Sequence, residues 1–435
     1  MHKGSIKIIF YLFVCILNTA YSQRVINSPY SRYGLGELQQ AGFANNLSMG
    51  GISAGLQNDT IAPYNINFSN PASHSTLRLT VFDFGLKSNT LQLESSDKKY
   101  VINKTSLSYL AIAFPVISGK WGASFGLLPF SNVGYKIYDE KEEDNIGLVK
   151  YTYDGTGGIN QVYFGNGFRI KRFSVGINTS YLFGDLSFNS RDSFPHGTFY
   201  TNSFISQVVR VGDFYHTFGV QYKQPLKKNW SITLGLTGGL NTQLNVKKST
   251  FAATYKSNYG IDLVKDTIVN DIDVRESIKI PMSLGGGVVI KKGTKWLFGF
   301  DYSVQDWSTF DSFGQKGLLG NSNRFAFGMQ FIPNKNAAYK DGYYKKISYR
   351  AGFRYADSYL EIHNTQLKDY AITFGAGFPL RKIQVGQVYT QSIVNVGFEI
   401  GENGAIQNQL VRERYIKAIF SFTLNDRWFI KRKYD

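Results

Sequence analysis

The chain has 435 residues, a formal charge of +17 and a single cysteine, Cys15. Aromatic side chains make up 16% of it, glycine contributes 44 residues, and mean hydropathy is slightly negative. This composition excludes a helical membrane protein and a disulfide framework, and no zinc-finger spacing or aromatic–basic motif supports a nucleic-acid partner.

Residues 1–22 have the pattern of a secretory signal peptide. Two lysines precede an apolar run at residues 8–17, which is too short to cross a bilayer as a helix. Small residues at Ala20 and Ser22 predict cleavage after Ser22, and an uncleaved signal anchor is the alternative. Cys15 follows a valine, which does not suit a lipoprotein cleavage site. We therefore expect an exported mature chain without cysteine.

Residues 23–76 form the second region. They are rich in glycine and asparagine, and they lack the strict alternation of the chain that follows. The region ends just after Asn70-Pro71-Ala72-Ser73. Because it lies between an export signal and a long series of strand-like segments, we expect it to be a plug inside a barrel.

From residue 77 to residue 425, large apolar residues alternate with small or polar ones. Phe325, Phe327 and Met329, for example, alternate with Ala326 and Gly328. A period of two places successive side chains on opposite faces of a strand. We predict an all-β, transmembrane antiparallel β-barrel of about 14 strands, followed by a basic tail at residues 426–435. A soluble exported β-protein is the alternative.

The predicted connections alternate between short and long, as they do in outer-membrane barrels. The short ones are basic, and either contact with lipid headgroups or docking of a periplasmic partner explains their charge. One long connection, Ile332–Tyr344, is expected on the short side, and the acidic segment Asp139–Asp144 is expected to be an outer loop. The expected basic turns are Lys171-Arg172, Lys227-Lys228, Lys291-Lys292 and Arg381-Lys382.

Two segments interrupt the alternation. The first contains Pro129, Ser131, Asn132 and Gly134. Proline donates no ladder hydrogen bond, so this segment is either a kink that opens the wall sideways or a harmless bulge above the membrane. The second, Asp154–Gly158, is either a hairpin turn or a glycine kink inside one strand. A total of about 14 strands assumes the kink.

Arg350 and Arg354 alternate with Tyr349, Phe353 and Tyr355. If these aromatic side chains face lipid, both arginines point into the lumen. There they could bind an anionic headgroup or carboxylate of a ligand, or they could pair with an Asp or Glu of the lumen.

The sequence contains no pattern that indicates an enzyme. The five histidines are scattered, and no HExxH spacing, GxSxG elbow or P-loop occurs. We expect no enzymatic activity, no metal and no cofactor.

The region around Leu47-Ser48-Met49-Gly50-Gly51, followed by Asn70-Pro71-Ala72, resembles the plug of the FadL family of long-chain fatty acid outer-membrane transporters. The stretch Trp296–Phe310 also resembles a strand of that family. The resemblance implies a bacterial outer-membrane location and a barrel of similar strand number. It also implies plug-motif roles for Gly50, Gly51, Asn70, Pro71 and Ala72, and a wall kink used as a lateral exit at Pro129 to Gly134.

By this resemblance, the expected function is uptake of a hydrophobic small molecule, such as a fatty acid, through a plugged lumen and a lateral wall opening. The uptake hypothesis expects an apolar lumen pocket of about 300 Å³ or more. The opening Pro29–Gly36 and the basic tail depart from the family pattern. The alternative is therefore a structural or accessory subunit of an outer-membrane protein secretion or assembly complex. The expected partners are membrane lipids, a hydrophobic ligand, and other outer-membrane or periplasmic proteins.

Overall fold

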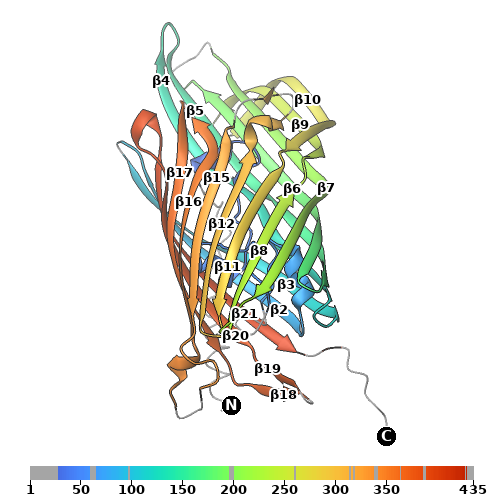
Figure 1. Ribbon diagram of the computed structural model, residues 1–435. Coiled ribbons are helices and arrows are strands. Elements are labelled where there is room, and N and C mark those ends of the chain that lie inside the picture. The colour runs from blue at the N-terminus through green and yellow to red at the C-terminus, as the bar shows by residue number, and fades with distance from the viewer. Residues whose placement is uncertain are drawn as a thin grey trace, which may run out of the picture.

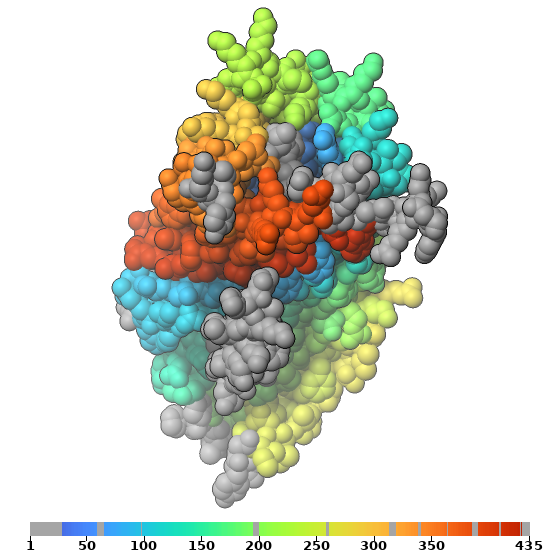
Figure 2. Space-filling model, turned by 90° about the horizontal axis from the view of Figure 1, so that it is seen from below, coloured from blue at the N-terminus to red at the C-terminus, as the bar shows by residue number. Residues whose placement is uncertain are grey.

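The fold is a closed antiparallel β-barrel (Figure 1). Consecutive wall strands pair with one another, and the last pairs with the first, from Thr80↔Asp426 to Glu94↔Arg412. Figure 2 shows the first wall strands, in blue to cyan, beside the last, in red. Within the described residues the wall has 14 strands, as predicted.

The computed structural model describes residues 28–58, 65–96, 98–194, 200–258, 261–312, 315–316, 319–337, 341–362, 364–385, 388–426 and 428. The predicted signal peptide, its cleavage site and most of the basic tail lie outside these residues. The wall strands are β2 (Thr80–Glu94), β3 (Lys99–Ile117), β4 (Trp121–Glu143), β5 (Gly147–Ile170), β6 (Phe173–Ser193), β7 (Asn202–Pro225), β8 (Trp230–Gly239), β11 (Ser283–Lys292), β12 (Trp296–Asp306), β15 (Asn321–Phe331), β16 (Ser348–Ile362), β17 (Thr365–Pro379), β20 (Ile393–Gly404) and β21 (Arg412–Asp426).

Shorter elements precede and connect the wall strands. No helix among the described residues is long and apolar enough to cross a membrane. The remaining elements are η1 (Pro29–Arg32), β1 (Glu37–Leu38), α2 (Ala44–Leu47), η2 (Pro71–Thr76), β9 (Thr242–Asn258), β10 (Ile261–Ile280), η3 (Trp307–Thr309), β13 (Asp311–Ser312), β14 (Gln315–Lys316), η5 (Tyr343–Lys346), β18 (Ile383–Val385), β19 (Val388–Thr390) and η6 (Gln407–Gln409).

The wall strands place their large apolar side chains on the outside. On β15, Phe325, Phe327 and Met329 are exposed, whereas Ala326 and Gln330 are buried toward the lumen. The same division occurs on β6 and β21. Period-two alternation therefore sorts the side chains into an apolar outer face and a smaller, more polar inner face, as a membrane barrel requires.

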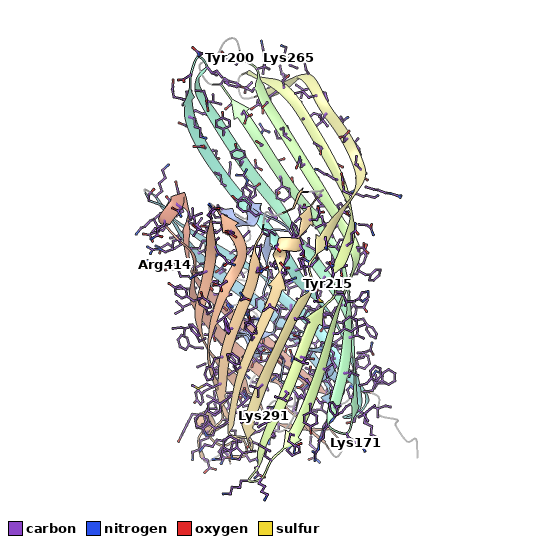
Figure 3. All side chains as sticks on the ribbon, turned by 45° about the horizontal axis from the view of Figure 1, so that its top comes forward. Lys171, Tyr200, Tyr215, Lys265, Lys291 and Arg414 are labelled. Carbon is purple, nitrogen blue, oxygen red and sulfur yellow. The ribbon has the colours of Figure 1, made fainter. Side chains whose placement is uncertain are left out.

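The two ends of the barrel differ. Lys171 and Lys291 lie toward one end and Tyr200 and Lys265 toward the other (Figure 3); we call these the short-turn end and the extended end. At the extended end several strands continue beyond the others. The acidic segment predicted as an outer loop is instead mostly strand, because β4 runs to Glu143 and turns directly into β5. The Gly-rich stretch Asp154–Gly158 lies inside the single strand β5, as the strand total assumed.

Two connections at the short-turn end are long. The one between β15 and β16 contains η5, in agreement with the prediction for Ile332–Tyr344. The prediction of a short turn at Arg381-Lys382 is wrong, because the hairpin β18–β19 lies between β17 and β20. Lys291 also differs from the prediction: it is a buried lumen residue of β11, and its Nζ donates to the Gln57 carbonyl at 3.2 Å.

Candidate functional site

The described residues before the first wall strand lie inside the barrel. We call residues 28–58 and 65–76 the N-terminal segment. Its helix α2 contacts β17, β20 and β21, whereas η2 contacts β3, β4, β5, β6 and β7. These two sets of strands lie on different parts of the wall, so the segment crosses the lumen. Ala44, Ile52, Ile66 and Ala72 are fully buried.

The backbone at Gly50 and Gly51 needs glycine. Both residues have positive φ, 66° and 82°. The Gly50 N–H donates to the Thr373 hydroxyl at 2.8 Å, and the Gly50 carbonyl accepts from Arg324 at 3.1 Å. A Cβ on Gly50 would lie 2.6 Å from the carbonyl oxygen of Phe353. The pair thus lets the chain turn in direct contact with the wall.

Asn70 organises the second motif. Its Oδ1 accepts from the Ala72 N–H at 3.1 Å and caps η2, and its Nδ2 donates to the Ala54 carbonyl at 2.7 Å. Pro71 is the first residue of η2, where its fixed φ suits the turn. A Cβ on Gly176 of β6 would lie 2.4 Å from the Pro71 carbonyl carbon. The motif therefore packs backbone to backbone against a wall glycine.

Asp301 is an anchor that the sequence did not identify. Its carboxylate, on β12, accepts hydrogen bonds from the backbone N–H groups of Ser53 at 2.6 Å and Ala54 at 2.9 Å. It lies in the Trp296–Phe310 stretch that resembles a family strand, but no local pattern connects it with a segment nearly 250 residues earlier.

The irregular segment on β4 lies at an interruption of the wall. The β3–β4 ladder runs from Ile117↔Trp121 only to Leu110↔Leu127. On the other side β4 stays paired with β5, with a bulge between Pro129 and Ser131. The structure thus has a bulge and, at the same height, the end of the β3–β4 ladder.

Beyond Leu127, β3 no longer pairs with β4, and the N-terminal segment pairs with this edge of β4 instead. Strand β1 pairs Leu38 with Ser131 and Glu37 with Asn132. The Gln39 N–H donates to the Phe130 carbonyl at 2.9 Å. The Gly134 N–H donates to the Ser31 hydroxyl at 3.1 Å. The chain before the wall therefore completes the sheet at this point.

Both candidate lumen arginines are buried inside the barrel. Arg354 donates to Glu399 at 2.9 Å, to Asp369 at 3.0 Å and to the Tyr415 hydroxyl at 2.9 Å, and it also contacts Gln40. Of the two alternatives, this geometry favours pairing with lumen carboxylates over binding of a ligand anion.

Arg350 contacts two side-chain amides. Its guanidinium donates to the Gln330 and Asn395 oxygens, each at 2.8 Å. These bonds link β16 to the neighbouring strand β15 and to β20.

A cavity of about 520 Å³ lies beside the N-terminal segment. It is larger than the 300 Å³ or so that hydrophobic uptake predicts, and Leu128 and Pro129 at the wall interruption help to line it. The lining is mixed rather than apolar throughout: beside apolar residues such as Leu47, Leu91 and Ile419, it contains charged ones. These include Lys87, Arg324, Arg354, Glu399, Glu413 and Lys417.

A family model described as BamG matches residues 5–435. Among solved structures, the Pseudomonas putida toluene transporter TodX aligns with a TM-score of 0.61 and 16% identity, covering 90% of this chain and 100% of that chain. A FadL homologue of Pseudomonas aeruginosa aligns with a TM-score of 0.57 and 12% identity, covering 91% and 100%. At these identities the likeness establishes a FadL-like fold. No curated protein matches the chain.

Proposed function

The chain belongs to the BamG family, and we propose that it is an outer-membrane barrel that serves as a structural or accessory subunit of a complex that secretes or assembles outer-membrane proteins. The family match is compatible with this role. The observation that carries the proposal is a cluster of charged, mutually paired side chains in the otherwise mixed lining of the cavity beside the N-terminal segment.

A conduit for hydrophobic molecules needs apolar walls, because moving an apolar ligand against a charge removes water without replacing its hydrogen bonds. In this barrel, Glu399 pairs with both Arg354 and Lys417, at 2.9 and 3.1 Å. Arg354 and Glu399 are already buried, so a passing hydrocarbon would desolvate the partly exposed Lys417 and Asp369. Arg354, Glu399 and Lys417 connect three wall strands, β16, β20 and β21.

The N-terminal segment is also fastened firmly. Asp301, Thr373 and Arg324 bind its backbone from three different wall strands. Strand β1 adds a further pairing to β4. Moving the N-terminal segment out of the lumen would break all of these contacts together. This favours a plug that stays in place over one that moves to open the barrel.

The orientation follows from the ends of the barrel. Outer-membrane barrels have short periplasmic turns and longer extracellular extensions. We therefore place the short-turn end, with Lys171 and Arg172, in the periplasm and the extended end at the cell surface. Export by the predicted signal peptide agrees with this placement.

Purification of the tagged full-length chain from its own bacterium in mild detergent tests the role. We expect it to be recovered with other envelope proteins at constant stoichiometry through size-exclusion chromatography. Recovery of this chain alone, folded and monodisperse, would contradict the proposal.

The second candidate function is uptake of a hydrophobic small molecule through a lateral wall opening. The observation that favours it is the end of the β3–β4 ladder beside Pro129, where the cavity reaches the wall. Uptake of a radiolabelled fatty acid by cells with and without the protein tests it. A defect that the wild-type chain restores would favour this second function.

A further inference from the structure

Aromatic residues mark the edge of the membrane near the short-turn end. Phe173, Trp230 and Trp296 are the first residues of β6, β8 and β12. Each has the same parity as the exposed apolar residues farther along its strand, so each side chain faces outward. Membrane barrels carry such a girdle of aromatic residues at each membrane–water interface. Short turns just outside the girdle, such as Lys171-Arg172, therefore lie at the level of the lipid headgroups.

Two longer connections continue past this level. Residues 332–347 contain η5, and residues 380–392 contain the hairpin β18–β19. Figure 1 shows β18 and β19 below the ends of β20 and β21, and the orange segment with η5 also lies below the wall. In the orientation proposed above, the described parts of both connections extend into the periplasm.

Hydrogen bonds hold the two connections against each other and against the barrel. The Tyr343 hydroxyl of η5 donates to the Pro379 carbonyl, directly before the second connection, at 3.0 Å. At the base of the hairpin, the Leu380 N–H donates to the Ser392 carbonyl at 2.8 Å, and the Leu380 carbonyl accepts from Nε2 of Gln391 at 2.8 Å. A surface whose backbone is held in place before binding loses less conformational entropy when a partner binds.

Large apolar side chains of these two connections are exposed. Tyr343 is 50%, Tyr344 is 60% and Ile383 is 62% exposed. Lipid hydrocarbon covers such residues on the wall, but these three lie beyond the girdle. Aromatic residues and arginine are enriched in protein–protein interfaces, and both occur here. We call the group the η5–β18 surface; it consists of Tyr343, Tyr344, Lys345, Lys346, Arg381, Lys382 and Ile383.

The charge around the η5–β18 surface indicates an acidic occupant. The two connections together contain six lysines or arginines and one carboxylate, Asp341. The ends of the adjoining strands contribute Lys295, Arg78 and Asp426, which add one further positive charge. The neighbourhood is therefore strongly positive, and it attracts a surface that is rich in carboxylates.

A protein partner fits this surface better than lipid headgroups do. Arg381 and Lys382 are exposed, and Lys345 and Lys346 are half-buried. Anionic headgroups have the right charge, but the girdle places them at the level of the short turns, which carry cations of their own. Carboxylates of a periplasmic protein can reach the η5–β18 surface and complement its charge.

We propose that the η5–β18 surface docks an acidic protein in the periplasm. The apolar centre of the contact covers Tyr344 and Ile383, and carboxylates of the partner meet Arg381 and Lys382. This inference rests on the proposed subunit role and names the surface that would serve it.

The test uses the tagged full-length chain, extracted from its own bacterium in mild detergent. The variant Arg381→Glu/Lys382→Glu reverses the charge of the surface. The matched control, Lys171→Glu/Arg172→Glu, makes the same change of charge in a short turn at the same end of the barrel. A faster-migrating band on unheated gels verifies that each barrel has folded.

A second variant tests the apolar centre of the contact. Tyr344→Asp/Ile383→Asp places two charges in it. The matched control, Tyr138→Asp/Val101→Asp, changes two residues of extended strands that are 66% and 64% exposed.

We expect each variant of the η5–β18 surface to reduce recovery of one partner about tenfold or more, while both controls retain it. That partner should be an acidic protein that proteinase K does not digest when it is added to intact cells. High salt, about 0.5 M NaCl, should weaken its binding to the wild type. Lysine substitutions in the partner's acidic patch should restore binding to the Arg381→Glu/Lys382→Glu chain.

If the folded variants keep every partner, the surface assignment is overturned and the subunit role stands. The assignment also falls if the controls lose the same partner, if proteinase K digests that partner on intact cells, or if the partner is a second copy of this chain. It falls equally if the charge variant loses only co-purified anionic phospholipid, measured as phosphate per barrel. If the wild type has no partner, both proposals fall.

Discussion

The Asp301 carboxylate on β12 accepts a 2.6 Å hydrogen bond from the backbone N–H of Ser53, so a wall residue holds the N-terminal segment by its main chain. Asp301→Ala leaves the N–H groups of Ser53 and Ala54 without this acceptor. We expect a loss of about 1–3 kcal/mol per buried donor, measured as faster proteolysis of the segment at moderate urea. Asp301→Asn keeps an acceptor oxygen and should cost clearly less. Equal cleavage of both variants and the wild type would refute the anchoring role.

We predict that Arg354 and its carboxylate partners stabilise the barrel as one energetically coupled network. Arg354→Met removes the guanidinium from the buried Glu399 and the half-buried Asp369 and leaves Glu399 with Lys417 as its remaining cation. Because a buried pair is broken, this should cost about 3 kcal/mol of unfolding free energy in urea titrations. Adding Glu399→Gln should recover part of this loss, because it removes the carboxylate that has lost its arginine partner. If the double variant is as unstable as the sum of the single ones, the two residues are not coupled.

The protection of the β4 edge against hydrogen exchange should depend on the backbone N–H of Gln39. Gln39→Pro removes the N–H that donates to the Phe130 carbonyl. We expect roughly fivefold faster hydrogen exchange at residues 131–134, because one hydrogen bond contributes about 1 kcal/mol. Gln39→Ala removes only the side chain and serves as the control. Similar exchange in both variants would show that β1 does not protect this edge.

The β2–β3 hairpin should loosen in acid. Glu94 pairs with Lys99 and with Arg412, each at 2.7 Å, and these bonds lower its pKa from the ordinary 4.5 to about 2. Since the pKa is lowered on folding, the contribution is complete above pH 4.5 and is lost as the pH falls toward 2. Hydrogen exchange at the hairpin should rise between pH 5 and pH 3 after correction for intrinsic rates. Glu94→Gln should remove this extra pH dependence; if it persists, the pairs are not its cause.

The sequence was informative where the chemistry is local. Alternation such as that of Phe325 to Met329 predicted the strands and their faces, and it led to the correct strand total because Asp154–Gly158 lies inside one strand. The hairpin β18–β19 was missed, because Arg381-Lys382 alone has the composition of an ordinary turn.

The candidate site was harder to predict, because its contacts join distant parts of the chain. Alternation placed Arg350 and Arg354 in the lumen, but their partners Asn395 and Glu399 are 45 residues away. The Gly50-Gly51 and Asn70-Pro71-Ala72 motifs could be singled out, whereas their wall partners, such as Gly176 and Thr373, carry no local signal.

The central claim is that the barrel works with its N-terminal segment fixed in place, and a disulfide tests it most directly. A Cβ built on Gly397 lies 3.6 Å from the Ser48 Cβ, a distance that suits a disulfide. The only natural cysteine, Cys15, lies in the predicted signal peptide. We predict that the Ser48→Cys/Gly397→Cys protein, oxidised in its own bacterium, retains its partners as the reduced form does. Loss of the partners on oxidation, reversed by dithiothreitol, would contradict the claim and show that the segment must move.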